Sequence, residues 1–389
     1  MCIVLFTTAH PDYALILIDN RDEFILRPTS RPHWWTHGAT GQQVLSSRDL
    51  QRAEKGTWMG MTRSGLFAVL TNYREANAHD ASHPVRDIKS RGSMVTAWLA
   101  GPAERTVKEA VNHLVRDDGV KGVGGFSMVC GKLRKREGGN IAIVSNRAVH
   151  ADEVPLFGHA RGETWGLSNT TFDAEVKWPK VELGTDLLRT TVEAAVGRGW
   201  AEKELLDGLF AILDTDTFPT PEPGTPFEQV TGLLRHTIFV PPLGDDAHHE
   251  AMRAAWARGL AAWENEEEQA EKKAEGGGEV AVKANGETMR ERQGEQTQQQ
   301  QRHRRGEEAE QHQQEQNRES AARAAATNSV GFETGLYGTQ RQTIMLVDWD
   351  GHVKFVERAL WDRNGNAISR GEGDVVHEFS IEGWDDGEQ

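Results

Sequence analysis

The sequence predicts an α+β layered domain, and three observations support this prediction. Short runs rich in β-branched and aromatic residues, such as CIVLFTTA from Cys2 and YALILIDN from Tyr13, are bounded by turn residues, as strands are. Other segments repeat apolar residues three and four positions apart, which predicts helices grouped between the strands. Hairpin signals join neighbouring strands, so we expect antiparallel sheets with helices packed on them.

Further strand patterns follow in order along the chain. GTWMGMTRSGLFAVLTN predicts a hairpin that turns at 63–65. In TIMLVDWDGHVKFVER, Asp350 and Gly351 form the dipeptide that a type I′ turn requires, with apolar runs on both sides. More strands are expected in GFSMVCGKL (125–133), NIAIVSN (140–146), HTIFVPP (236–242) and HEFSI (377–381). Helices are expected in SMVTAWLA (93–100), ERTVKEAVNHLV (104–115), TDLLRTTVEAAV (185–196) and EKELLDGLFAIL (202–213).

A biased segment separates the last two groups of strands. From about residue 264 to about residue 323 the chain is mostly Glu, Gln, Arg, Lys, Gly and Ala, which bury too little apolar area to offset the ordering entropy. We interpret 243–330 as a disordered or loosely helical insertion in a surface loop, which costs little because closure entropy grows slowly with length. The folded domain is then expected in 1–240 and 336–381.

Composition excludes several classes of protein. A formal charge of −15 argues against a nucleic-acid binder, since phosphate contacts need concentrated Lys and Arg. Two cysteines cannot make a disulfide framework and fit a reducing compartment. We see no secretory signal, and no apolar run approaches the roughly 18 residues of a transmembrane helix. We therefore expect a cytoplasmic protein, or one imported by a route that the sequence does not reveal, with no transmembrane segment and no nucleic-acid partner.

Cys2 follows the initiator methionine directly. Removal of Met1 would leave a thiol and a free α-amine on one residue, and an α-amine with a pKa of about 8 can serve as a general base. One residue would then supply both the nucleophile and the base. The alternative is that Cys2 simply packs at the end of a strand, since free cysteine is often buried. Position alone does not decide between these two interpretations.

The stretch DNRDEF after the second predicted strand carries a group of polar residues. Strand alternation places Arg21 and Glu23 on one face and Asn20 and Asp22 on the other. An arginine near Cys2 would lower the pKa of its thiol, because an opposite charge favours the thiolate. The alternative is a solvated strand end with a surface ion pair.

Six blocks in the same order resemble the NRDE family, also called the transport and Golgi organisation 2 family: MCIVLF, NRDEFILRP, GTWMG, GLFAVLTNYRE, WGLSNT and IMLVDWDGHVKFVER. The resemblance covers about 1–240 and 336–381. The family is grouped with the N-terminal nucleophile hydrolases, which implies an αββα sandwich of antiparallel sheets. It also implies roles in Golgi organisation, protein secretion, haem export, and lipid or acyl-CoA homeostasis.

Within that clan the chain is similar to the cysteine amidases of the penicillin V acylase and bile salt hydrolase type. This similarity implies Cys2 as nucleophile and Arg21 as the second-strand arginine, with Asn72 and Asn169 as oxyanion donors. Arg341 would be the late arginine of those enzymes. They place an aspartate three residues after the arginine, where this chain has Phe24, so the acid partner of the terminal amine is unassigned.

Two hypotheses follow. In the first, the protein is a cytosolic factor that binds a small molecule or lipid in a cleft at Cys2, with Asn20, Asp22 and Glu23 as candidate ligand-binding residues. Haem and acyl-CoA are its candidate ligands, no cofactor or metal is required, and the protein would associate peripherally with Golgi or mitochondria. In the second, it is a cysteine hydrolase that cleaves an amide C–N bond.

Overall fold

A computed structural model describes residues 2–73, 90–116, 120, 123–135, 141–148, 150–158, 161–172, 174–222, 225, 227–258 and 335–385. The chain divides into one unit made of 1–256 with 334–389 and a second of 257–333. The second unit lies almost wholly outside the described residues, as does most of the predicted insertion. Helix α6, Asp246–Arg258, lies within the range predicted as insertion.

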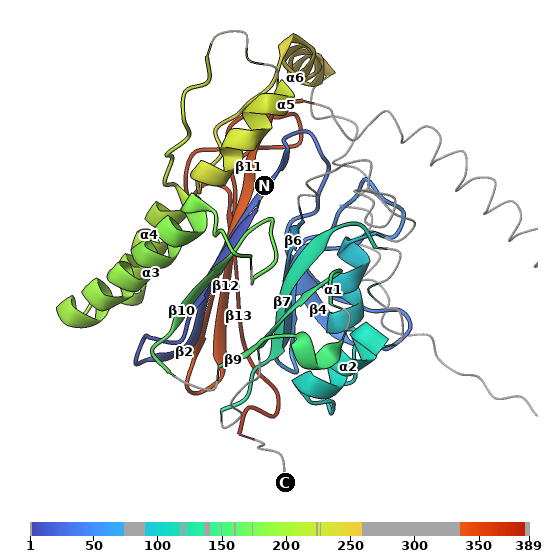
Figure 1. Ribbon diagram of the computed structural model, residues 1–389, viewed down its shortest axis with the longest axis vertical. Coiled ribbons are helices and arrows are strands. Elements are labelled where there is room, and N and C mark those ends of the chain that lie inside the picture. Colours follow the sequence, from blue (N-terminus) through green and yellow to red (C-terminus); the bar gives the residue numbers. More distant parts are fainter. Residues whose placement is uncertain are drawn as a thin grey trace, which may run out of the picture. The chain divides into compact units, whose positions relative to one another are not determined.

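Two antiparallel sheets form the centre of the first unit (Figure 1). In the first sheet the order is β10 (Thr164–Leu167), β1 (Ile3–Thr7), β2 (Tyr13–Phe24), β11 (Tyr337–Asp348), β12 (His352–Ala359) and β13 (Asp374–Ser380). In the second the order is β3 (His33–Thr36), β4 (Gln43–Ser46), β5 (Met59–Thr62), β6 (Leu66–Asn72), β7 (Phe126–Lys132), β8 (Ile141–Ser145) and β9 (Leu156–Phe157).

Helices cover the outer face of each sheet. Helices α3 (Pro179–Arg198) and α4 (Glu202–Leu213) pack on the first sheet, and α1 (Gly92–Leu99) and α2 (Val107–Arg116) pack on the second (Figure 1). The remaining helical segments are α5 (Phe227–Val230), η1 (Ala151–Glu153) and η2 (Thr231–His236). The layers therefore follow the order αββα, which confirms the predicted fold class. Among the described residues, no helix combines the length and apolar character needed to cross a membrane.

Alternation along β1 explains why the chain begins with a continuous apolar run. Val4 and Phe6 lie in the cluster between the two sheets, whereas Ile3 and Leu5 lie in the cluster beneath α3 and α4. Both faces of the strand are buried, so neither set of alternate positions can be polar. Each fully buried aliphatic or aromatic side chain contributes about 1.5–3 kcal/mol of transfer free energy.

The predicted helices are present, and their ends follow local rules. Helix α3 begins at Pro179, which needs no hydrogen bond for its missing N–H, and ends before Gly199, whose φ of 64° is the left-handed conformation of a helix cap. At the start of α4 the Glu204 carboxylate accepts the backbone N–H of Ala201 at 2.8 Å. This bond satisfies one of the free N–H groups of the first turn.

The strand predicted at 236–242 is wrong. Residues 231–236 form a 3₁₀ helix, and the segment after it meets the first sheet through a few separate bonds. The N–H of Val240 donates to the Thr339 hydroxyl at 2.8 Å, and its carbonyl accepts the Thr339 N–H at 2.9 Å. Pro241 and Pro242 lack the N–H groups that a continuous ladder needs, so the segment pairs again only at Leu243, which exchanges two backbone hydrogen bonds of 2.8 Å with Tyr337.

The turn between β11 and β12 is present, but it is not the predicted type I′ turn. That turn needs positive φ at two residues, and here only Gly351 is left-handed, at 78°. The Asp348 carboxylate accepts the N–H groups of Asp350 at 2.9 Å and His352 at 2.8 Å. This bonding favours a three-residue loop with glycine at its last position.

We predict that Gly351→Ala destabilises the protein by about 2–4 kcal/mol, because a left-handed alanine is strained and a Cβ would lie 2.4 Å from Cγ of Trp384. Gly371→Ala is the matched control, because its φ is 93° but nothing lies within 4 Å of its Cβ position. Gly371→Ala should lower the free energy of unfolding by only about 1–2 kcal/mol, which is the cost of holding an alanine in the left-handed backbone conformation. Denaturant unfolding measures both; equal losses would contradict the proposed Trp384 contact.

Candidate functional site

The polar residues of β2 lie on two faces of the first sheet, as strand alternation predicted. The guanidinium of Arg21 lies 4.2 Å from the centroid of the Trp58 ring, in the space between the sheets. On the opposite face the Asn20 amide donates to the carbonyls of Leu213 at 2.8 Å and Ile238 at 3.0 Å. Asn20 is fully buried, and these bonds give it a structural role beneath the helices.

Cys2 is buried at the start of β1, and both its side chain and its backbone contact neighbouring residues. Its Sγ is 3.8 Å from the backbone oxygen of Asp22. Its carbonyl accepts the Ser168 hydroxyl at 2.6 Å. The residue is 7% exposed, so the thiol is largely withdrawn from water.

Burial raises the pKa of the Cys2 thiol to about 11. The positive amino terminus of the chain lowers the pKa of this thiol, and the negative charges of Asp22 and Asp19 raise it. The thiol is therefore neutral at pH 7 while Met1 is attached. The prediction of a depressed pKa is wrong for this form of the chain, because desolvation exceeds the effect of nearby positive charge.

A buried ion pair lies next to Cys2 on the helix-facing side. Lys180, in the first turn of α3, is 0% exposed, and its Nζ is 4.0 Å from Oδ2 of Asp22. The other carboxylate oxygen, Oδ1, accepts the Thr339 hydroxyl at 2.7 Å, and the Tyr337 hydroxyl donates to the backbone oxygen of Asp22 at 3.0 Å. Burial lowers the pKa of Lys180, and the charge of Asp22 acts against this.

A second polar group lies on the face of the first sheet that points to the other sheet. Asp19 pairs with Thr343 of β11, which pairs with Glu357 of β12, so both acids occupy one row. Arg21 and Arg341 are paired in the next row. Buried charges persist only when other charges and hydrogen bonds compensate them, and these two rows alternate in sign.

Hydrogen bonds hold this inward group in place. Arg21 donates to the Gln340 side chain. Arg341 donates to the Thr29 hydroxyl at 3.2 Å and the Trp361 carbonyl at 3.1 Å. Burial lowers the pKa of Arg341 to about 10, and the charge of Glu357 raises it. Burial, followed by the charge of Asp22, raises the pKa of the Asp19 carboxyl well above its usual range.

Asn72 and Asn169 lie together. The Asn169 amide donates to the backbone oxygen of Asn72 at the end of β6, and Ser168 is 3.2 Å from the amide oxygen of Asn169. Because the Ser168 hydroxyl also donates to the carbonyl of Cys2, a chain of contacts joins Cys2 to both asparagines. One of the two amide N–H groups of Asn169 donates to Asn72 in this structure. Only the other N–H could therefore bond an oxyanion.

Glu23 lies at the edge of this region rather than at Cys2. Its carboxylate is 3.3 Å from Arg27 and 3.9 Å from Arg21. The sequence offered Cys2 and Asp22 as candidate site residues, and the structure brings these two together, but sequence reasoning did not consider Lys180, Ser168 or the inward acids. Ser168 directly precedes Asn169, which the family resemblance had already singled out, so its position in the sequence could have identified it. Nothing in the sequence marks Lys180 as buried. Among the described residues no group of three or more His, Cys, Asp or Glu is arranged to hold a metal ion.

Comparison with known proteins places the chain in a family. The family model described as Transport and Golgi organisation 2 matches residues 1–362. A Bos taurus protein named Transport and Golgi organization protein 2 homolog is 30% identical over 233 residues, covering 57% of this chain and 75% of that protein. The Homo sapiens protein of the same name is 28% identical over 231 residues, with the same two coverages, 57% and 75%.

Two solved structures show a weaker likeness. One is a Caenorhabditis elegans N-acylethanolamine-hydrolyzing acid amidase ortholog, with a TM-score of 0.35 and 12% identity over 54% of this chain and 85% of that chain. The other is a mutant conjugated bile acid hydrolase from Clostridium perfringens, with a TM-score of 0.31 and 8% identity over 99% of this chain and 94% of that chain. The family match confirms the resemblance of the six sequence blocks: this chain belongs to the Transport and Golgi organisation 2 family.

Proposed function

We propose that the protein binds a small ligand at the Cys2 end of the sandwich, and that this binding supports Golgi organisation, protein secretion, and haem or acyl-lipid homeostasis. Family membership supports a role in Golgi and transport organisation. The observation that favours binding is unused hydrogen-bonding capacity on the inward polar rows. Within the described part of the chain, Asp19 Oδ2, Arg341 Nε and Glu357 Oε1 are buried without a hydrogen-bond partner.

Such atoms are costly to bury unless water or a ligand satisfies them. Glu357 Oε1 is 3.8 Å from the guanidinium nitrogens of Arg31 and Arg341, beyond hydrogen-bonding distance. A ligand with both a polar head and an apolar body would suit this region, because the apolar cluster between the sheets continues from the same face. Haem and acyl-CoA both have this character and are our candidate ligands.

A second candidate function is amide hydrolysis by Cys2. The contacts of Ser168 with the Cys2 carbonyl and the Asn169 amide oxygen favour it, because they bring Cys2 and Asn169 together at the ends of the paired strands β1 and β10. In the reaction the thiolate would attack the carbonyl carbon, the amine would leave with a proton, and water would hydrolyse the thioester. Removal of Met1 is required for the α-amine of Cys2 to act as the base.

Arg341→Met should weaken binding of haem or palmitoyl-CoA by about tenfold, because it removes a buried charge-assisted donor from the inward rows. Isothermal titration of each probe against the folded variant measures this effect. The matched control is Arg189→Met, since Arg189 is half exposed on α3. Equal affinities for the wild type and both variants, or no saturable binding of either probe, would contradict the proposed location.

Cys2→Ala should restore secretion and Golgi morphology in cells that lack the protein, to the level of wild type, because binding does not need the nucleophile. Cys130→Ala is the control, since Cys130 is a fully buried cysteine on β7 of the other sheet. If Cys2→Ala fails while remaining folded and abundant, and Cys130→Ala succeeds, covalent catalysis replaces binding as the better account.

Iodoacetamide should alkylate Cys2 slowly at pH 7 in the folded chain that keeps Met1. The rate should rise about tenfold per pH unit until the pH approaches about 11, because the thiolate is the reactive form. Intact-mass and peptide mass spectrometry report the state of Met1 and the labelled residue. Labelling at pH 7 as fast as a free thiol would show that burial does not protect Cys2.

A further inference from the structure

The α-nitrogen of Cys2 lies beside the buried pair of Lys180 and Asp22. The pairing of β1 with β2, continued by one residue, places Cys2 opposite Arg21. The α-nitrogen is on the side of Cys2 that leads toward the row of Asp22. The Sγ atom of Cys2 is 3.8 Å from the backbone oxygen of Asp22, which agrees with this placement. Removal of Met1 would therefore produce a free α-amine next to Asp22.

The carboxylate of Asp22 is held by neighbours on both of its oxygens. The Thr339 hydroxyl donates to Oδ1 at 2.7 Å, and Nζ of Lys180 is 4.0 Å from Oδ2. Both side chains of the ion pair are 0% exposed, so water screens their charges only weakly. The effect of Asp22 on a nearby amine is therefore always combined with that of Lys180.

The position of Lys180 is not favoured by its own helix. Lys180 is the second residue of α3, and a cation in the first turn meets the positive end of the helix dipole. Burial adds to this cost and lowers the pKa of Lys180, against the charge of Asp22. A buried ion pair contributes little net stability, because desolvation offsets the attraction. An electrostatic role at the neighbouring chain terminus accounts for a residue that stability alone does not explain.

The other charged and titratable groups around Cys2 come from β2, β11 and the segment before α1. The Tyr337 hydroxyl of β11 donates to the backbone oxygen of Asp22 at 3.0 Å, and burial raises its pKa well above the usual range, so it stays neutral. Arg21 points to the opposite face of the sheet, over Trp58. The remaining groups are Asp19 and Glu23 of β2 and Arg91 before α1.

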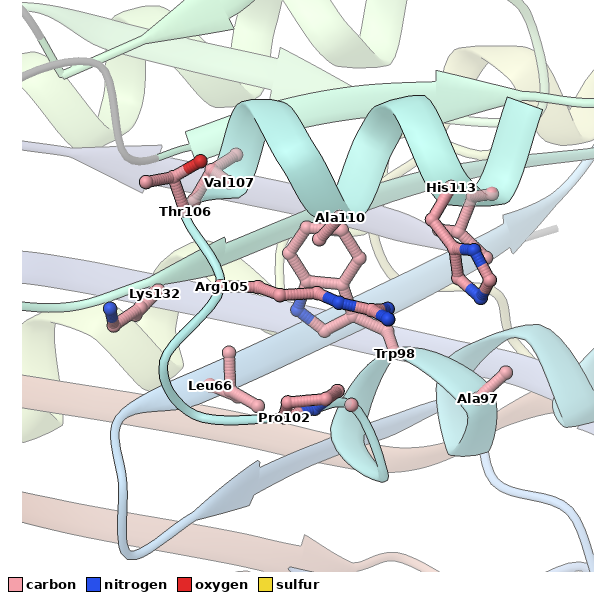
Figure 2. A pocket seen from close by; sticks show the side chains of 12 residues that line it. Leu66, Ala97, Trp98, Pro102, Arg105, Thr106, Val107, Ala110, His113 and Lys132 are labelled. Atoms are coloured by element: carbon pink, nitrogen blue, oxygen red, sulfur yellow. The ribbon is translucent and has the colours of Figure 1, made fainter. Parts of the chain in front are cut away.

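The bases of the other sheet do not belong to this group. Figure 2 shows a hollow between α1 and α2, with Arg105, His113 and Lys132 among the side chains that line it. These residues lie on the helix-covered face of the sheet that contains β6 and β7, whereas Cys2 precedes β1 of the first sheet. The charge balance at the chain terminus therefore depends on β2, β11, α3 and the segment before α1.

We propose that Lys180 is a positioning residue that neutralises Asp22 beside the chain terminus, so that the α-amine of Cys2 is a proton acceptor near neutral pH once Met1 is removed. A carboxylate alone raises the pKa of a neighbouring amine, because it favours the ammonium form, and a second cation opposes this effect. With the pair intact, the amine keeps a pKa close to its ordinary value of about 8. This role rests on amide hydrolysis, the second candidate function, because that reaction uses the amine as its base.

Carbon-13 labelling of cysteine tests this proposal in the full chain after methionine aminopeptidase treatment. Cys130→Ala leaves Cys2 as the labelled residue, and its Cα and Cβ shifts follow the titration of the amine and the thiol. Lys180→Met should raise the amine pKa by about one unit or more, since the α-ammonium then takes the place of Lys180 beside Asp22. The matched control is Lys177→Met, an exposed lysine before α3, which should shift this pKa by less than about 0.3.

A double variant, Lys180→Met with Asp22→Asn, removes both charges and so should fold. Its amine pKa should lie within about 0.5 of the wild-type value, and this result decides the proposal alone if circular dichroism shows that Lys180→Met is unfolded. An unchanged pKa in folded Lys180→Met would overturn the proposal. So would a double variant about one unit or more below wild type, or a chain that keeps Met1.

The amine pKa is measured without any substrate. Failure of the proposed role of Lys180 is therefore distinguishable from the absence of hydrolysis, which the Cys2→Ala complementation tests.

Discussion

The pairing of β2 with β11 is the constraint on which the rest of the structure depends. It joins strands near the two ends of the chain, so that Arg21 meets Gln340 across 319 positions of sequence. Its register decides which polar residues face the second sheet and which face α3 and α4. A slip of one residue would exchange the two sets and bury every charge against the wrong partner.

Both strands are apolar in one half and polar in the other. Residues 15–18 of β2 and 344–347 of β11 are fully buried apolar residues that build the core. Residues 19–22 of β2 and 339–343 of β11 are buried polar residues, and Asp22 among them contacts Cys2. Because the apolar half fixes the register, the polar half is held where its own electrostatics alone would not place it. Burial of the apolar half thereby supplies free energy that offsets the desolvation cost of the buried charges.

The sequence predicted the layered fold because apolar periodicity is local information. The runs at β1 and β2 and the helices α3 and α4 follow it directly. The failures arose from contacts that no local pattern records. Arg21 suggested a stabilised thiolate, but the pKa of Cys2 follows from burial, which depends on the packing of distant segments. Lys180 follows a proline at a helix start, a position that usually faces solvent, and only the fold places Asp22 beside it.

A charged side chain that continues an apolar face is therefore informative once the strand direction is known. At β2 the inward face passes from Leu15 and Leu17 to Asp19 and Arg21, and the charges compensate one another within the protein. At β7 the face beneath the helices passes in the same way from apolar residues to Lys132. Lys132 also interacts with other groups of the protein, so at both strands a buried charge that ends an apolar face is compensated from within the fold.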